Sequence, residues 1–484
     1  MLWVALELPS LPLQLVERAG VSREPVVICE GPEQRPVVIC ANASASSAGV
    51  REGQAVAAAK ALVGELRVVP RDPAAEREAL QGLAAWAGQF TPMACLDGQG
   101  IALEIEPSLK LFSGHARLCS AIRRGIRHLG FHAVAGIAPT PLAARLFARA
   151  EARGLHVRSC IDLAGLRERV ADLPLFLLDW PARTLAHLTD LGVLRMRDML
   201  ELPMEGVARR FGPEIAIHLG RLMGTIADPR EPYSPPPRFR ARLELPAEAD
   251  GVEALLFPLR RMLAEMEGAL RGRGAGVQRL MLWLEHGRKA RTRVEMEFAS
   301  PERESDFILA IAREKLGRLT LPAATLALDL RAEALLPYMP RESTWLPGAR
   351  EQAIGRERLI ERLSARLGRD RVFGIAVGDD HRPDRSWSPV QPGHSGVATN
   401  PAAPAARPVW LLNRPHRLIT RDDIPSHQGE LSFIAGPERI ESGWWDGAEV
   451  RRDYYVAANA RGETYWIFRE HRGDQGWYLH GVFA

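Results

Sequence analysis

Short apolar runs alternate with amphipathic, alanine-rich segments over residues 1–165 of the chain. The opening stretch, LWVALELPSLPLQLVER at residues 2–18, shows this pattern, because an apolar run comes first and an amphipathic segment follows at once. A buried strand that leads into a helix is expected from it. Repeated along the chain, the alternation predicts an α/β region. Its strands are expected at 2–7, 25–30, 36–40, 101–105 and 132–137, and its helices at 73–89, 114–129 and 141–152.

The pattern changes beyond this region. Residues 166–227 are expected to be helical, with Gly192 as one of the turn signals. DPREPYSPPPR, at 228–238, is a proline-rich linker expected to face solvent. Strands and two amphipathic helices alternate in 239–335, which is typical of an α+β module. The remaining segments are expected to be a linker at 336–350, a helix and strand segment at 351–390, a flexible linker at 391–408 and an aromatic, β-rich module at 409–484.

Length and composition indicate the general class of protein. A chain of 484 residues is too long for one hydrophobic core, and we expect roughly three or four domains. With 46% hydrophobic and 25% charged residues, the composition is typical of soluble globular proteins. No apolar run approaches the ~20 residues of a membrane span, and the N-terminus lacks the basic segment of a signal peptide. We therefore expect a cytoplasmic protein with no membrane partner.

Net charge and cysteine content limit which partners and metals can be expected. The net charge is only +4, so evidence for a polyanionic partner has to come from where the arginines cluster. The five cysteines are scattered, with no pair spaced for zinc. They are expected to be reduced, mostly buried thiols. The cysteine pattern therefore predicts no metal site.

Three motifs and one module carry a family resemblance when they are taken in order. The motifs are ANASASSAGVREGQ (41–54), GIAPTPLAA (136–144) and LTDLGVLRMRDMLEL (188–202), and the module is the strand–helix region after the proline-rich linker. Their order resembles that of the Y-family translesion DNA polymerases over most of residues 1–335. The resemblance implies a right-hand fold, with palm and fingers in 1–165, a thumb with a helix–hairpin–helix in 166–227, and a little finger in 239–335.

The C-terminal tail refines this resemblance. Its motifs GPERIESGWWDG (436–447), RDYYVA (452–457) and WYLHGVFA (477–484) are similar to a catalytically degenerate subfamily found in a bacterial SOS mutagenesis cassette. The expected fold class is therefore a multidomain α/β plus α+β right hand with an extra β-rich module. The tail is expected to bind other proteins of the cassette. Its paired tryptophans either stack on bases or form the core of the module, and we favour the core.

The acids needed for two-metal catalysis are incomplete. Nucleotidyl transfer by two Mg²⁺ ions needs carboxylates that bridge both metals. Active family members carry two acids at the end of the first strand and an Asp-Glu pair on a later hairpin. Here Glu7 is followed by Leu and Pro9, and Asp97 is followed by Gly98. Glu104 and Glu106 are either solvated strand residues or remnants of an acidic cluster.

The residues that grip the triphosphate are also missing. Tyr and Arg of the family's fingers hold the phosphates by hydrogen bonds and charge, and here Ala43 and Ser46 stand at those positions. The palm loop normally offers Asn-Lys, and here Pro141 stands where the lysine is expected. Because both sites have changed together, we predict a pseudo-polymerase with no metal and no cofactor.

Features suited to binding the DNA backbone are retained. In RFRARLEL (238–245) and RKARTRVEMEF (288–298), arginines fall on one strand face and apolar residues on the other. Such rows suit phosphates and position a duplex without reading its sequence. The thumb-like hairpin is expected to point backbone N–H groups at a phosphate. The alternative for the arginine rows is a basic face that is merely solvated. The alternative for the hairpin is a structural turn. The candidate DNA-binding residues are Gly192, Arg209, Arg210, Arg238, Arg240, Arg242, Arg288, Lys289, Arg291 and Arg293.

The segment RESTWLPG (341–348) stands where this subfamily usually carries a sliding-clamp motif. Glu342 takes the place of the usual Gln, and Trp345 and Leu346 form the apolar pair. The resemblance implies that the chain is a non-catalytic scaffold in translesion synthesis. Its implied partners are DNA without sequence preference, the RecA-like protein ImuA, an error-prone C-family polymerase and the clamp.

Two other hypotheses stay open from the sequence. The first is a working, low-efficiency polymerase that uses Glu7, Asp97 and Glu104 in an altered geometry. The second is a pure protein–protein hub whose polymerase-like fold no longer touches DNA. Magnesium-dependent primer extension separates the first from the scaffold, and a salt titration of DNA binding separates the second.

Overall fold

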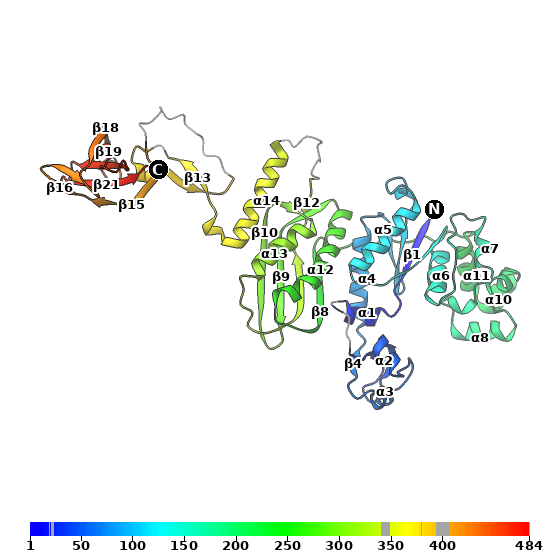
Figure 1. Cartoon of the computed structure of the whole chain (residues 1–484). Helices are drawn as coiled ribbons and strands as arrows, with labels where there is room; N and C mark the ends of the chain where they lie inside the picture. The colour runs from blue at the N-terminus through cyan, green and yellow to red at the C-terminus, as the bar shows by residue number, and fades with distance from the viewer. Residues whose placement is uncertain (19, 21–23, 340–348, 379, 394–406, 484) are drawn as a thin grey trace. The chain divides into compact units, whose positions relative to one another are not determined.

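The computed structural model describes residues 1–483 except 19, 21–23, 340–348, 379 and 394–406. The chain forms two units, Met1–Leu346 and Pro347–Ala484, and each is described by itself (Figure 1). The expected clamp-binding residues Glu342, Trp345 and Leu346 lie outside the described residues. None of the described helices is long and apolar enough to cross a membrane. All five cysteines are free and buried, which confirms the expected thiol state.

The first sheet forms the centre of the palm-like region. β1 lies between β6 and β7, with β5 beyond β6, and all neighbouring strands are antiparallel. Trp3 and Ala5 of β1 share a core with α6, whereas Val4 and Leu6 share a core with α4 and α5. The ribbon shows α6 on one side of β1 and α4 and α5 on the other (Figure 1). Because helices cover both faces, β1 is apolar from Trp3 to Leu6. The elements are β1 (Trp3–Glu7), α1 (Leu11–Glu17), α4 (Pro73–Ala87), β5 (Ala94–Asp97), β6 (Gly100–Glu104), α5 (His115–His128), β7 (Val134–Ala138) and α6 (Pro141–Ala152).

A small fingers-like region is inserted between α1 and α4. Its sheet has the order β3-β2-β4, and α2 and α3 pack on it through a core that includes Val27, Val38 and Ala59. Asn42 begins α2, since its side-chain oxygen accepts a hydrogen bond from the N–H of Ala45 at 2.9 Å. The elements are β2 (Val26–Glu30), β3 (Val37–Ala41), α2 (Ala43–Ser47), α3 (Val56–Leu62) and β4 (Arg67–Pro70).

Residues 166–223 form the expected thumb-like helices. Met196, Val207 and Leu219 are buried in the same core as Trp3 of the first sheet, so these helices pack on the α6 side of the palm-like region. Gly192 has a φ of +79° just after α8, where it ends the helix in a conformation that other residues rarely adopt. The helices are α7 (Leu166–Val170), α8 (Ala182–Asp190), α9 (Met196–Leu200), α10 (Met204–Phe211) and α11 (Pro213–Met223).

The proline-rich linker at 228–238 is mostly exposed, as expected, but contacts that the sequence did not reveal hold it in place. Arg230 Nη1 lies 3.2 Å from Asp97 Oδ1, and the N–H of Tyr233 donates to the carbonyl of Ala94 at 2.7 Å. Further along, Arg273 Nη1 donates to the carbonyl of Pro236 at 2.6 Å. Because partners lie on both neighbouring regions, the linker is held along the β5 edge instead of remaining free.

The little-finger-like module is a sheet with the order β10-β9-β11-β8 and two helices. Its helix α12 packs against α4 of the palm-like region. Gly82 and Gly268 allow this close approach, because a Cβ at either position would collide with Glu265 or Trp86. The elements are β8 (Phe239–Ala249), α12 (Val252–Gly272), β9 (Ala275–His286), β10 (Lys289–Glu302), α13 (Ser305–Leu316), β11 (Thr325–Ala332) and β12 (Leu336–Pro337).

A buried ion pair stabilises the same contact. Arg18 and Glu265 bind each other with side chains that are only 7% and 8% exposed. Arg18 also donates from Nε to the carbonyl of Leu129 at 2.9 Å, and its guanidinium lies 4.5 Å from the centre of the Phe131 ring. Removing either charge would leave the other buried and unpaired.

The second unit is β-rich, as expected. Its main sheet has the order β15-β21-β20-β19-β18, with a separate apolar core on each face. Trp444 and Trp445 are 70% and 59% exposed, so the interpretation of these tryptophans as core residues was wrong. The elements are α14 (Ala349–Leu367), β13 (Gly374–Val377), β14 (Trp387–Val390), β15 (Trp410–Arg417), β16 (Ile419–Arg421), β17 (Ile424–Ser426), β18 (Ser432–Ser442), β19 (Val450–Ala458), β20 (Thr464–Glu470) and β21 (Trp477–Val482).

The loop of the β13–β14 hairpin belongs to this second unit. The buried Arg382 reaches both carboxylate oxygens of Asp446, at 3.0 and 2.7 Å, and Asp384 accepts from Nε2 of the fully buried His480 at 2.8 Å. These contacts join the hairpin to the main sheet. Together, the α/β, helical and α+β regions and the C-terminal β-rich module confirm the expected fold class.

Candidate functional site

The two surviving palm acids lie at one end of the first sheet. Glu7 ends β1 and Asp97 ends β5, and both are paired in register with Gly100 of β6. Their side chains are 13% and 8% exposed. Both residues therefore lie at strand ends, where the family resemblance implies metal-binding acids.

Two arginines of α6 lie on these acids. Arg145 Nη1 is 3.2 Å from Asp97 Oδ1, and Arg149 Nε is 3.6 Å from Glu7 Oε1. Both guanidiniums also bind Asp179, which precedes α8, at 2.6 Å from Arg145 and 2.5 Å from Arg149. The cluster therefore ties the palm-like sheet to the start of the thumb-like helices.

The electrostatics of the cluster follow from burial and these cations. Burial raises the pKa of Glu7, and the charges of Arg149 and Arg145 oppose that rise. Burial acts on Asp179 in the same direction, but the hydrogen bond from Arg149 and the charges of both arginines hold its pKa below the usual value. A cavity of about 360 Å³ opens beside the cluster, lined by Glu7, Asp179 and both arginines among others.

The residues present do not fit two Mg²⁺ ions. Asp97 Oδ1 receives hydrogen bonds from Arg145 and Arg230, each at 3.2 Å, and only Oδ2 is buried without a partner. Because two guanidiniums hold Oδ1, Asp97 offers one oxygen, which falls short of the several oxygen ligands that each Mg²⁺ requires. In the described part of the chain, no group of three or more His, Cys, Asp or Glu residues is placed to hold a metal ion.

Gly98 also cannot readily be replaced by the family's second hairpin acid. Its φ is +62°, which disfavours any residue with a Cβ, and a Cβ built there would collide with the guanidinium of Arg145. Arg145 therefore lies where the side chain of a glutamate at this position would begin. Pro9, at the position of the second strand-end acid, follows β1 and carries no carboxylate.

Glu104 and Glu106 are not remnants of this acidic cluster. Glu104 pairs with Trp3, whereas Glu7 pairs with Gly100. The two pairs are four positions apart along the strands, a separation of about 13 Å at the usual rise per residue. Glu106 binds the N-terminal amine at 2.5 Å. The structure thus contradicts a catalytic trio of Glu7, Asp97 and Glu104.

The degenerate nucleotide-binding positions have structural roles or none. Ala43 and Ser46 are exposed on α2. Pro141 is the first residue of α6, and Thr140 before it begins the helix. Thr140 Oγ1 accepts from the N–H of Ala143 at 3.2 Å and donates to the carbonyl of Leu222 at 2.7 Å. This loop is thus built for capping a helix and contacting α11.

The arginine rows of the little-finger-like sheet have the expected facing. Along β8, Arg240 and Arg242 are exposed and alternate with buried Phe239, Ala241 and Leu243. Most cations of this face are nevertheless ion-paired, which the sequence did not reveal. The pairs are Arg240–Asp329 at 3.3 Å, Arg242–Glu244 at 2.8 Å, Arg242–Glu285 and Arg291–Glu285 at 3.1 Å, and Arg293–Glu295 at 2.9 Å.

Three cations on or next to this sheet differ from the rest. Arg238, Arg288 and Lys289 are exposed and form no ion pair within the described residues. Arg288 and Lys289 lie at the β9–β10 turn, and Arg238 directly precedes β8. They can meet a phosphate without first giving up a carboxylate.

Trp283 is a residue of this face that the sequence analysis missed. It is half-buried on β9, in register with Arg293 and Asp329, and the Arg293 guanidinium lies 6.0 Å from the centre of its ring. Arg145, Arg149, Arg230 and Asp179 were also missed. The one signal for the first two was their i, i+4 spacing on a helix that follows a palm-like strand.

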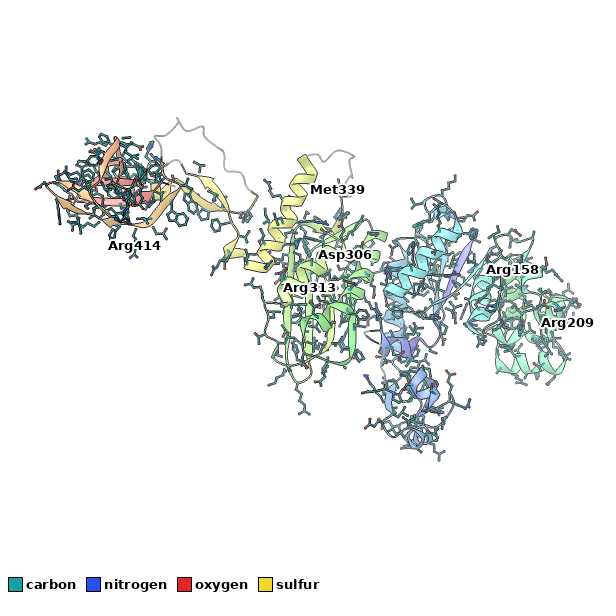
Figure 2. All side chains as sticks on the ribbon, viewed as in Figure 1. Arg158, Arg209, Asp306, Arg313, Met339 and Arg414 are labelled. Carbon is teal, nitrogen blue, oxygen red and sulfur yellow. The ribbon has the colours of Figure 1, made fainter. Side chains whose placement is uncertain are left out.

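The thumb-like hairpin has fewer free backbone N–H donors for a phosphate than expected. The N–H groups of Gly192 and Val193 donate to Thr189 and Leu188 carbonyls at 2.9 Å. Those of Leu194 and Arg195 donate to Asp198 Oδ2 at 3.1 and 2.9 Å. These donors already have acceptors, so the phosphate contact at Gly192 stays a prediction. Arg209 and Arg210 are exposed on α10, with Arg209 at the outer edge of the helical region (Figure 2).

Comparison with known proteins places this geometry in a family context. Residues 12–149 match the impB/mucB/samB family. This part of the chain is therefore similar to that family, and it includes the palm-like sheet described above. Over 472 residues the chain is 28% identical to Protein ImuB of Caulobacter vibrioides strain NA1000 / CB15N, an alignment that covers 90% of this chain and 100% of that relative. Protein ImuB of strain ATCC 19089 / CIP 103742 / CB 15 gives the same values.

The expected resemblance to ImuB is thereby confirmed. Three solved structures are also similar. A Y-family DNA polymerase chimera of Dbh and Dpo4 is 16% identical with a TM-score of 0.40, over 69% of this chain and 98% of that one. DinB from Sulfolobus solfataricus is 14% identical with a TM-score of 0.40, over 70% and 100%. An insertion ternary complex of Dbh DNA polymerase is 15% identical with a TM-score of 0.41, over 69% and 99%.

Proposed function

We propose that this chain is a non-catalytic scaffold that binds damaged primer-template DNA and recruits an error-prone C-family polymerase for SOS translesion synthesis. One observation carries the non-catalytic part of the proposal. Both remaining palm acids are bound by arginines of the same chain, Glu7 by Arg149 and Asp97 by Arg145 and Arg230. Because arginine side chains bind the acids that would otherwise hold metal ions, the arrangement suits a structural cluster and does not suit nucleotidyl transfer.

DNA binding is proposed for the little-finger-like sheet. The first candidates for phosphate contacts are Arg238, Arg288 and Lys289, which have no ion pair with any residue that the structure describes. The paired arginines of the same face have to exchange a carboxylate for a phosphate, so each contributes less. Binding is therefore expected to be modest, independent of sequence and sensitive to salt.

Partner recruitment rests on the similarity to ImuB. The C-terminal unit is proposed to bind ImuA and the C-family polymerase in the cytoplasm. The segment with Glu342, Trp345 and Leu346 is proposed to bind the sliding clamp. Replacing Trp345 and Leu346 by Ala together should weaken clamp binding by ~2 kcal/mol or more, about thirtyfold. A lowered melting temperature in that variant would instead mean that the pair packs on a folded module.

The DNA-binding part is tested by titrating a labelled primer-template with the purified full chain at several salt concentrations. Replacing Arg238, Arg288 and Lys289 by Ala should flatten the log–log salt slope by about 0.9 for each phosphate that is no longer bound. Arg242→Ala is the matched control, since Arg242 already pairs with Glu244 and Glu285 and should change the slope less. Absence of salt-dependent binding by the unaltered chain would favour the protein–protein hub.

The recruitment part needs a second measurement on the same DNA. The C-family polymerase is added to the bound primer-template, and its retention is followed with and without this chain. We expect retention to increase in the presence of the chain and to fall when residues 409–484 are removed. Equal retention in both cases would contradict the scaffold function.

A further inference from the structure

The contact between α4 and the little-finger-like module forms a pocket that overlaps the proposed DNA surface at Arg238 and Arg240 and extends beyond it. Its volume is about 470 Å³, and it lies between α4, the end of α12, the linker and the start of β8. Gly82 at the close α4–α12 contact and Glu265 of the buried Arg18–Glu265 pair are among its lining residues. The pocket therefore exists only because the little-finger-like module is seated on the palm-like region.

Four arginines line this pocket: Arg77 from α4, Arg273 from the end of α12, and Arg238 and Arg240 from the start of β8. Two glutamates line it as well, but Glu265 is already neutralised by Arg18, which leaves the exposed Glu78. Cations are thus in excess within the lining.

The bonding state of the four arginines differs. Arg77 and Arg238 are exposed and have no ion pair within the described residues. Arg273 donates to the carbonyls of Pro235 and Pro236, which are neutral acceptors and leave its charge uncompensated. Only Arg240 has a carboxylate partner, Asp329, among the residues that the structure describes. Three guanidinium charges from three different elements therefore remain available to an anion.

We propose that this pocket is a phosphate site that extends the DNA-backbone surface from the little-finger-like sheet onto α4, with Arg77 as the contact on the palm side. Arg238 and Arg240 belong both to the pocket and to the arginine row of β8, so the two surfaces are continuous. A duplex that lies along the β8 row places its next backbone phosphates at this pocket. The inference rests on the proposed DNA binding and adds Arg77, a residue of a different region.

The test is a salt titration of duplex primer-template binding by the full chain and three variants. Arg77→Ala should flatten the log–log salt slope by about 0.9, and Arg77→Lys should restore it, because a phosphate contact needs the positive charge. Arg124→Ala on α5 removes an equally exposed charge outside the pocket and should leave the slope unchanged. Arg77 is exposed and has no ion pair within the described residues, so its replacement should not lower the melting temperature.

The possible outcomes separate this inference from the proposed function. If the unaltered chain binds DNA and replacing Arg288 and Lys289, which lie outside the pocket, flattens the slope, but Arg77→Ala does not, the pocket is not a DNA phosphate site while the proposed function stands. If the unaltered chain shows no salt-dependent binding, the proposed function itself fails. A second arm measures the melting temperature with inorganic phosphate at constant ionic strength. Stabilisation that depends on Arg77 without any change of the DNA slope would assign the pocket to a free anion and overturn the proposal.

Discussion

The guanidinium of Arg145 lies directly on the carboxylate of Asp97, with Nη1 3.2 Å from Oδ1. Asp97 stands where the family resemblance implies a metal-binding acid, and Arg145 comes from the helix that packs under the same sheet. Through Asp179 the same arginine also contacts the start of the thumb-like helices, at 2.6 Å. A position associated with catalysis in the family therefore carries a structural bond in this chain.

Arg145→Ala should destabilise the first unit. Removing one partner of a buried pair costs on the order of 3–5 kcal/mol, because the other charge stays buried. Asp97 is 8% exposed but Asp179 is 55% exposed, so we expect the lower end of this range. Thermal and denaturant unfolding measure the change. Arg153→Ala, on an exposed residue just after the same helix, is the control and should stay within about 0.5 kcal/mol of the unaltered protein. Equal stability of the two variants would show that the cluster is not structural.

Glu7→Gln and Asp97→Asn should leave damage-induced mutagenesis close to normal. The amides keep the size of the carboxylates and one acceptor oxygen, but they remove the charge that a catalytic metal requires. Mutation frequency after DNA damage is measured in cells together with the amount of the protein. Loss of mutagenesis comparable to gene deletion, at normal protein levels, would favour an active polymerase.

The second unit should lose stability in acid through Asp453. The Arg439 guanidinium and the His471 ring bind this carboxylate and lower its pKa to about 2. Because folding lowers the pKa, the stabilisation is present above the unfolded value of about 3.9 and is lost as the pH falls towards 2. Asp453→Asn should therefore melt at a temperature that depends less on pH in this window. The same pH dependence in both proteins would mean that the Arg439–Asp453 pair adds no stability.

Glu265→Ala should loosen the little-finger-like module from the palm-like region. The substitution leaves Arg18 buried without its partner. The linker contains Arg230, whose side chain is only 18% exposed in its bond to Asp97, so trypsin should cut there slowly in the unaltered chain and faster in the variant. Glu253→Ala on the same helix breaks an exposed pair with Arg313 and should change little. Equal cleavage rates at Arg230 in both variants would show that the Arg18–Glu265 pair does not hold the little-finger-like module on the palm-like region.

Local sequence patterns predicted the elements that carry the candidate site. The apolar run before Glu7 identified β1, and the alternation of arginine with Phe239, Ala241 and Leu243 identified the exposed face of β8. Both features depend on neighbours in sequence, so periodicity was enough to find them.

Contacts between distant segments could not be predicted in this way. The bond from Arg230 to Asp97 joins the linker to β5, and that from Arg18 to Glu265 joins the end of α1 to α12. Composition suggested a solvated linker, which is mostly exposed, but it did not reveal the contacts that hold the linker in place. It also suggested a core role for Trp444 and Trp445, which was wrong. A short aromatic run does not reveal whether it lies within a strand or, as in this chain, in the turn between β18 and β19.

The most direct test of the non-catalytic function is a primer-extension assay with the purified full chain. A labelled primer-template is incubated with all four deoxynucleoside triphosphates and either Mg²⁺ or Mn²⁺, over a wide range of protein concentration, and Asp97→Asn is run in parallel. Because Glu7 and Asp97 are bound by Arg149, Arg145 and Arg230, we predict no extended primer with either metal. Metal-dependent extension by the unaltered chain that is lost in Asp97→Asn would contradict this prediction and establish an active polymerase.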